Sequence, residues 1–191
     1  TTEIYTLSLH DALPICILGL GIGLGCIILL LALVIHEKSF DRFIPDHKNV
    51  YRIMFGESSS SQYPLAEEML AEFPEVKDYF RFYQANNIQL RNQKQDLVKD
   101  QYFGFSDPSI YNILGIGMIA GGAAISLSEV AISEETAQKY FGNNSPLGAV
   151  LSVKLNDEFL DLSVCGVYKD FPSASTLFPR FIANIDQKSV V

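Results

Sequence analysis

Several groups of residues in this sequence have the chemical types that active sites use, beginning with two pairs of acids. Adjacent carboxylates occur at Glu67-Glu68 and at Glu134-Glu135. Two carboxylates work as general acid and base only when both reach one substrate, whereas neighbours on a helix point about 100° apart. Both pairs lie where a helix is expected to begin, and negative charge there complements the helix dipole. We interpret both pairs as helix-start charges.

A glycine-rich motif, Gly115-x-Gly117-x-x-Ala120, formally matches a dinucleotide-binding fingerprint. That fingerprint needs a strand before it, a long helix after it and an acid about twenty residues further on. Here a helix-like segment precedes the motif and another glycine pair follows it. The pattern G-x-x-x-x-G-K-[ST] does not occur in the sequence. The chain is therefore predicted to bind no nucleotide cofactor and to contain no P-loop ATPase.

Histidine and cysteine show no spacing typical of a metal site, a disulfide framework or a nucleophile–base pair. These residues are His10, His36, His47, Cys16, Cys26 and Cys165. Cys165 lies in a strand-like segment and is predicted to be a small buried hydrophobe. The sequence predicts no catalytic residue, no metal site and no enzyme.

The strongest signal is an apolar block near the N-terminus. Residues 15–35 are 21 consecutive residues without a charge, an Asn or a Gln. As a helix this block is about 31 Å long, which matches the hydrocarbon core of a bilayer. A buried helix of a soluble protein would show a polar stripe, and a signal peptide would have a basic leader, which residues 1–14 lack. We predict a transmembrane helix over 15–35, in contact with lipid.

The first half of this block contains four glycines at alternate positions, Gly19, Gly21, Gly23 and Gly25. They form two interleaved G-x-x-x-G pairs, and small residues at that spacing let another helix backbone approach closely. The other interpretation is that glycine is simply common in membrane helices. The density of the four favours a helix-packing face.

The two ends of the sequence do not look like natural termini. Residues 1–14 resemble translated sequencing-adapter read-through, so we expect this leader not to belong to the native protein. At the other end the sequence stops without a terminating pattern, so we expect the domain over residues 36–191 to be truncated.

Charge is concentrated after the apolar block. Residues 36–191 contain all 14 Lys and Arg and 20 of the 22 Asp and Glu, which gives this part a net charge of −6. An acidic domain of this kind is not expected to bind nucleic acid. The basic residues just after the block would place the domain in the cytoplasm if the positive-inside rule applied, but the doubtful leader leaves one flank uncounted.

The pattern after residue 36 mixes short strands and short helices, so the fold class predicted is α+β. A helix is expected to start at Pro64 and end by Pro74, another to start at Asp107 as N-cap, and a third to run from Ser133 to Gly142. Strands are expected over residues 50–55, 79–83, 88–91, 96–103, 130–132, 150–155 and 159–168, and a glycine loop over 115–122.

From residue 15 onward the chain resembles the N-terminal part of a MacB-like/FtsX-like ABC transporter permease. The blocks that carry the resemblance are residues 18–43, 48–53, 64–76, 106–110, 132–142 with 146–148, and 166–172 with Ser175. The most specific of them is ISEETAQKYFG followed by PLG. Each block alone is weak, and their order and spacing together are specific.

This resemblance implies a membrane helix followed by a MacB-like periplasmic core domain, mixed α+β, anchored in a bacterial inner membrane. It implies a permease homodimer that works with a separate ABC ATPase subunit, whose ATP hydrolysis moves the extracytoplasmic domain during export or mechanotransmission. It also implies an extracytoplasmic partner or substrate, which the sequence does not identify. One alternative is a membrane-tethered sensor or ligand-binding domain, and a third is a membrane-anchored enzyme.

Overall fold

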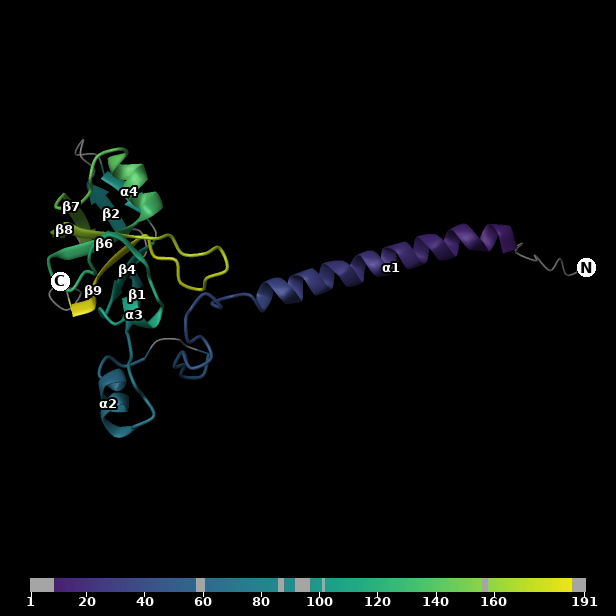
Figure 1. Cartoon of the computed structure of the whole chain (residues 1–191), viewed down its shortest axis with the longest axis horizontal. Helices are drawn as coiled ribbons and strands as arrows, with labels where there is room; N and C mark the ends of the chain where they lie inside the picture. The colour runs from purple at the N-terminus through teal and green to yellow at the C-terminus, as the bar shows by residue number, and fades with distance from the viewer. Residues whose placement is uncertain are drawn as a thin grey trace, which may run out of the picture. The chain divides into compact units, whose positions relative to one another are not determined.

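The computed structural model describes residues 9–57, 61–85, 88–91, 97–100, 102–155 and 158–186 (Figure 1). The chain divides into two compact units, Thr1–Phe40 and Asp41–Val191. The expected domain bounds, 15–35 and 36–191, differ slightly from this division and stay a prediction.

The first unit contains one long helix, α1 (Leu9–Glu37). Its segment Pro14–Glu37 is 24 residues long and, by length and composition, apolar enough to cross a membrane. The prediction that the helix begins after Pro14 is wrong, because α1 continues through this residue. Proline removes one backbone hydrogen bond, and near the N-terminal end of a 29-residue helix that loss does not stop the helix.

The second unit is an α+β domain, which confirms the predicted fold class. Its described strands form one nine-stranded sheet in the order β1-β4-β9-β6-β8-β7-β2-β3, with β5 paired to β8. The strands are β1 (Phe82–Ala85), β2 (Ile88–Arg91), β3 (Leu97–Asp100), β4 (Phe103–Ser106), β5 (Met118–Gly121), β6 (Glu129–Ser133), β7 (Val150–Leu155), β8 (Glu158–Tyr168) and β9 (Phe181–Asn184). The helices are α2 (Leu65–Glu72), α3 (Ile110–Ile113) and α4 (Glu134–Phe141).

Both faces of the central strands are covered. Alternate residues of β6 point to opposite faces, with Val130 and Ile132 in one core and Ala131 in the other. The first core contains Phe141 of α4, so we call it the α4-side core. The second contains Ile110 of α3 and is the α3-side core. The sheet is therefore the rigid centre of the domain.

Helix α4 is the element whose ends the sequence predicts best. The Ser133 side chain accepts a hydrogen bond from the backbone N–H of Thr136, which is the geometry of an N-cap. Gly142 follows the helix with a φ of 58°, a conformation that favours glycine. The prediction of this helix is confirmed at both ends.

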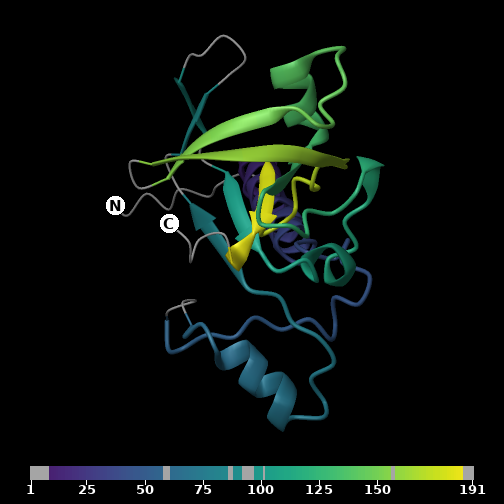
Figure 2. The same cartoon turned by 90° about the vertical axis from the view of Figure 1, so that its left-hand side faces the viewer.

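Helix α2 is also confirmed, and it ends at Glu72 before Pro74. In contrast to α4 it contains no buried residue, and its Pro64 start has no side-chain cap. Figures 1 and 2 both show α2 standing apart from the sheet.

Four strand predictions agree with the structure: residues 88–91 are β2, 130–132 lie in β6, and 150–155 and 159–168 form the hairpin β7–β8. The turn expected at residues 156–158 falls mostly outside the described residues. Strand 79–83 is shifted, because β1 begins at Phe82.

Three other predictions are wrong. The strand expected over residues 50–55 is absent from the described sheet: residues 50–54 have no regular secondary structure, and Phe55 alone is in a β-bridge. Residues 96–103 contain parts of two strands: β3 pairs with β2, whereas β4 pairs with β1 and β9. The glycine loop contains β5, which pairs with β8.

Strand β5 can lie close to β8 because a glycine of each strand stands where the two backbones approach. Gly121 has a φ of 69°, and a Cβ at this position would lie 2.1 Å from the Cys165 carbonyl oxygen. A Cβ at Gly166 would lie equally close to the Gly122 oxygen. Only glycine permits this approach of the two backbones.

Candidate functional site

Among the described residues, the acids, histidines and cysteines singled out in the sequence do not form one metal-binding cluster. No three His, Cys, Asp or Glu side chains in that part of the chain are arranged to hold a metal ion. Each acidic pair lies in the first turn of its helix, Glu67-Glu68 in α2 and Glu134-Glu135 in α4. Glu135 forms an ion pair with Arg180 at 3.3 Å. These positions agree with the interpretation of the pairs as helix-start charges.

The glycine motif lacks the surroundings of a dinucleotide site. Gly115 follows the four-residue helix α3, and Met118 starts the strand β5, so no strand–motif–helix unit is present. Gly115 serves packing instead: its φ is 64°, and a Cβ there would lie 2.6 Å from the Pro45 ring.

Cys165 is less buried than expected, since its side chain is half-buried at the edge of the α3-side core. Its Sγ lies 3.5 Å from the carbonyl oxygens of Gly122 and Val130. Burial raises the pKa of the thiol to about 11, so the reactive thiolate is scarce at neutral pH. The residue behaves as a packed thiol.

The four glycines predicted as a helix-packing face all lie within α1, and an added Cβ at any of them would meet no atom within 4 Å. Residues two apart on a helix point about 200° apart. Gly19 and Gly23 therefore lie on nearly the opposite side of α1 from Gly21 and Gly25. That another helix packs on these glycines stays a prediction. It now concerns two narrow faces of α1, one with Gly19 and Gly23 and the other with Gly21 and Gly25.

The first residues of the second unit are fastened to the domain by a cluster that we call the juxtamembrane clasp: Asp41, Phe43, Ile44, Phe171, Ala174 and Thr176. The Asp41 backbone N–H donates to the Ala174 oxygen at 2.9 Å. The Thr176 backbone N–H donates to Asp41 Oδ1 at 2.8 Å, and its hydroxyl donates to Asp41 Oδ2. One carboxylate thus binds a loop that is distant in sequence.

The clasp continues into the core. Phe43 meets Phe171 edge to face at 5.9 Å between ring centroids, and Ile44 is buried in the α3-side core with Ile110. Asp41 has a φ of 57°, the single non-glycine residue with positive φ in the described chain. Such a conformation costs free energy in most residues, so surrounding contacts must hold it. The contacts of Asp41 with Ala174 and Thr176 therefore hold the first residue of the domain in place.

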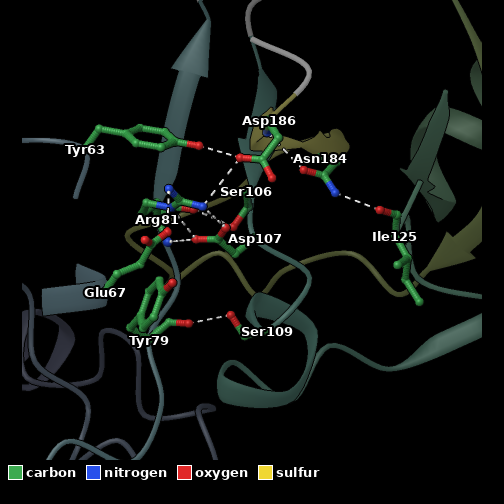
Figure 3. A network of polar contacts seen from close by, with 10 residues as sticks. All are labelled: Tyr63, Glu67, Tyr79, Arg81, Ser106, Asp107, Ser109, Ile125, Asn184 and Asp186. Carbon is green, nitrogen blue, oxygen red and sulfur yellow. Dashed lines mark hydrogen bonds and ion pairs between the residues drawn. The ribbon is translucent and has the colours of Figure 1, made fainter. Parts of the chain in front are cut away.

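A second polar cluster centres on Arg81 (Figure 3). Arg81 precedes β1 and Asp107 follows β4, and the antiparallel pairing of these strands places Phe82 opposite Ser106. The two charged residues are therefore neighbours. Arg81 Nε donates to Asp107 Oδ2 at 2.9 Å, and Nη2 donates to Oδ1 at 2.6 Å. This two-pronged hydrogen bond raises the pKa of the Arg81 guanidinium.

The same guanidinium reaches two further segments. Its Cζ lies 4.1 Å from the centre of the Tyr63 ring, and Nη1 lies 3.6 Å from Glu67 Oε1. Nη2 lies 3.6 Å from Asp186 Oδ1, the atom to which the Tyr63 hydroxyl donates. Arg81 thereby joins the start of α2 and the residues after β9 to the sheet. Nη1 is buried and makes no hydrogen bond within the described part of the chain.

The sequence did not single out Arg81, Asp41 or Thr176. Asp107 was predicted to cap a helix, and this is wrong: α3 starts after Ser109, and the Asp107 carboxylate is bound to Arg81. One feature of the sequence could have indicated the Arg81–Asp107 pair. Asp107 directly follows a strand, and a short charged side chain there can bind a residue at the end of the neighbouring strand.

The comparisons with known proteins agree with this fold. A family model described as MacB-like periplasmic core domain matches residues 15–190. This chain belongs to that family. The MacB-like periplasmic core domain is part of ABC-type membrane permeases and is not itself catalytic. Among proteins with a curated function, none matches this chain.

Three solved structures are similar to this MacB-like domain. A domain of a protein named as a permease from Porphyromonas gingivalis has a TM-score of 0.56 and 21% identity, over 64% of this chain and 52% of that one. The periplasmic region of MacB from Actinobacillus actinomycetemcomitans has a TM-score of 0.54 and 14% identity, over 76% and 71%. The extracellular domain of the noncanonic ABC-type transporter YknZ from Gram-positive bacteria has a TM-score of 0.50 and 15% identity, over 64% and 62%.

At these identities the similarity concerns the fold. The MacB-like chain spans about half the length of the first of these structures.

Proposed function

We propose that this chain is the N-terminal part of an ABC transporter permease, in which α1 crosses the inner membrane and the domain after it lies in the periplasm. A separate ABC ATPase subunit hydrolyses ATP, and the permease, acting as a homodimer, passes the resulting movement through its membrane helices to this domain. The domain then acts on an extracytoplasmic substrate or partner, in export or mechanotransmission.

The observation that carries the coupling role is the juxtamembrane clasp. Movement of a membrane helix reaches an attached domain only if the connecting residues are fixed to that domain. Asp41 comes four residues after the end of α1 and is held by Ala174 and Thr176, and Ile44 is anchored in the core. Few residues separate the helix from a fixed point, which favours transmission of rigid-body movement.

The membrane and the ATPase are supported by different observations. The exposed apolar surface of Pro14–Glu37 matches contact with lipid. The ATPase is supported by family membership. The sequence downstream of Val191 tests this part: a permease requires further membrane helices, whereas a tethered sensor requires one more helix followed by a cytoplasmic signalling domain.

The clasp is tested in the full-length permease, reconstituted with its ATPase and spin-labelled at Lys169→Cys in both subunits. We expect ATP to change the distance between the labels, and Asp41→Ala to reduce that change while ATPase binding is retained. The substitution removes two hydrogen bonds, which are worth about 1–2 kcal/mol together.

Asp41→Asn is the matched control, because asparagine tolerates a positive φ and keeps one acceptor oxygen. It should preserve most of the change in distance. An Asp41→Ala permease that moves as the unaltered protein does would show that the clasp does not carry the coupling.

A further inference from the structure

The first residues of the domain differ in charge from the rest of it. Residues 41–55, which we call the basic segment, contain Arg42, Lys48 and Arg52 against Asp41 and Asp46, a net charge of +1. Residues 56–191 contain 10 Lys and Arg against 17 Asp and Glu, a net charge of −7. Positive charge is therefore concentrated directly after the membrane helix, at the start of an otherwise acidic domain.

The three basic side chains of this segment are not neutralised within the domain. All three are exposed, and none forms an ion pair within the described part of the chain. The two acids of the segment are bound elsewhere: Asp41 accepts from Thr176, and the Asp46 carboxylate accepts from Asn49 Nδ2 at 2.9 and 3.0 Å. The three cations are thus free to bind a group outside the chain.

Apolar side chains lie among these charges and are also uncovered. Tyr51 is 82% exposed, and Met54 and Phe55 are more than half exposed. Such a mixture of basic and aromatic residues is typical of segments at a bilayer surface, where the cations meet the headgroups and the rings lie at headgroup level. The composition of the basic segment therefore fits a lipid surface.

The chain keeps this segment close to the bilayer. Arg42 comes five residues after Glu37, the last residue of α1. Five residues span at most about 18 Å even when fully extended. Successive hydrogen-bonded turns within residues 41–49 shorten the path further. Because the clasp fixes the start of the segment to the domain, any lipid that binds the segment also holds the domain.

The side of the membrane gives a further argument. Short extracytoplasmic flanks of membrane helices normally contain few Lys and Arg. The basic segment of this periplasmic domain departs from that rule, and the departure is not explained by ion pairs within the described domain. An acidic protein surface would also attract the three cations, but their position just after the membrane helix favours lipid.

We infer that the basic segment binds anionic phospholipid headgroups of the bilayer that α1 crosses, with Arg42, Lys48 and Arg52 on the phosphates and Tyr51 at headgroup level. The same lipid surface repels the acidic remainder of the domain, so the contact sets which face of the domain points to the membrane. This inference rests on the membrane placement of α1 in the proposed function and does not depend on ATP-driven movement.

Fluorescence quenching by lipid headgroups in the full-length permease tests this contact. A cysteine-free permease is labelled with bimane at His47→Cys, an exposed position in the basic segment, or at Asn143→Cys, an exposed position after α4. It is reconstituted in nanodiscs that contain phosphatidylcholine with a nitroxide on its headgroup, which quenches bimane only on close approach. The discs are made with and without about one-third phosphatidylglycerol, which supplies the anionic headgroups.

Two triple variants with the same change in charge are compared. The test variant replaces the basic residues of the segment, as Arg42→Gln, Lys48→Gln and Arg52→Gln. The control variant replaces three lysines outside the segment, as Lys77→Gln, Lys99→Gln and Lys154→Gln. Folding is not expected to suffer in the test variant, because its three side chains are exposed and form no ion pair within the described chain.

We expect the label at residue 47 to be quenched in the anionic discs and much less in phosphatidylcholine alone, while the label at residue 143 is quenched in neither. The test variant should lower the ratio of contacting to non-contacting domains at least about tenfold, because each Lys or Arg near an anionic surface favours the contact about fivefold. The control variant should leave that ratio unchanged.

Salt gives a second measure, which needs no substitution of a basic residue. Raising the salt from about 0.1 M to about 1 M shortens the Debye length from about 10 Å to about 3 Å. Quenching of the label at residue 47 in the anionic discs should therefore fall with salt.

Three results would overturn the inference. Quenching at residue 47 could be the same with and without phosphatidylglycerol, or the same in the test and control variants. A label that no headgroup quenches, yet that is shielded from a water-soluble quencher, would identify a protein surface as the occupant. A permease that enters the discs without this contact contradicts this inference alone, whereas one that does not enter them contradicts the proposed membrane placement as well.

Discussion

Helices α2 and α4 of this domain have the same length, but they differ in their end signals and in their burial. Both have two glutamates in the first turn and apolar residues on one side. Helix α4 has a side-chain cap and packs on the sheet, whereas α2 has neither a cap nor a buried residue. The comparison teaches that local sequence determines whether a helix forms, while its contribution to stability depends on what covers it.

The largest expected effect comes from removing the side chain of Phe141 in α4, compared with that of Phe73, which directly follows α2. Phe141→Ala should lower the free energy of unfolding by about 3–5 kcal/mol, because Phe141 is 6% exposed and its removal leaves a cavity. Phe73→Ala in the same chain should cost less than about 1 kcal/mol, because half of that side chain is already in solvent. Denaturant unfolding in detergent micelles measures both. Equal losses would mean that α2 is as well packed as α4.

The next effect compares two ion pairs of Arg81, one with Asp107 at the end of β4 and one with Glu67 of α2. Asp107→Ala should cost about 2–3 kcal/mol, because it leaves the mostly buried Arg81 guanidinium without its strongest partner. Glu67→Ala should cost less than about 0.5 kcal/mol, since the Glu67 side chain is 60% exposed. The same unfolding measurement separates the two. If Glu67→Ala cost as much as Asp107→Ala, α2 would be anchored more firmly than its exposure indicates.

The smallest effect concerns the helix cap. Ser133→Ala should cost about 1 kcal/mol, because the backbone N–H of Thr136 loses its acceptor in a buried position. Ser133→Thr keeps a hydroxyl and should restore most of the loss. Hydrogen exchange at the start of α4 localises the effect. Unchanged protection in Ser133→Ala would show that the cap does not stabilise α4.

Features with a strong local signal could be predicted from the sequence. The apolar run predicts α1, the Ser133 and Gly142 signals predict the ends of α4, and the β7–β8 hairpin follows from two adjacent strand-like runs. The strand β9 could not be predicted, because it pairs in parallel with β4, nearly eighty residues earlier, and residues 181–184 are buried on both faces. Such long-range pairings leave little periodicity in the sequence.

The candidate site was less predictable than the fold. The clasp and the Arg81 cluster join residues that are far apart in sequence, Asp41 with Thr176 and Arg81 with Asp107. Single charged residues in polar turns carry no spacing that marks such a pair. Residues 51–54 show the opposite failure: the local composition predicts a strand, but no described strand pairs with it.

The central claim is that α1 holds this domain outside the inner membrane, and labelling in whole cells tests it most directly. Cys165 is unsuitable, because burial raises the pKa of its thiol to about 11. Lys169 is exposed just after β8, so Lys169→Cys in the cysteine-free full-length permease is the suitable position. The account predicts that a membrane-impermeant maleimide labels it as fully in intact spheroplasts as after lysis, while a cytoplasmic marker protein reacts only after lysis. Labelling of Lys169→Cys only after lysis would contradict the account.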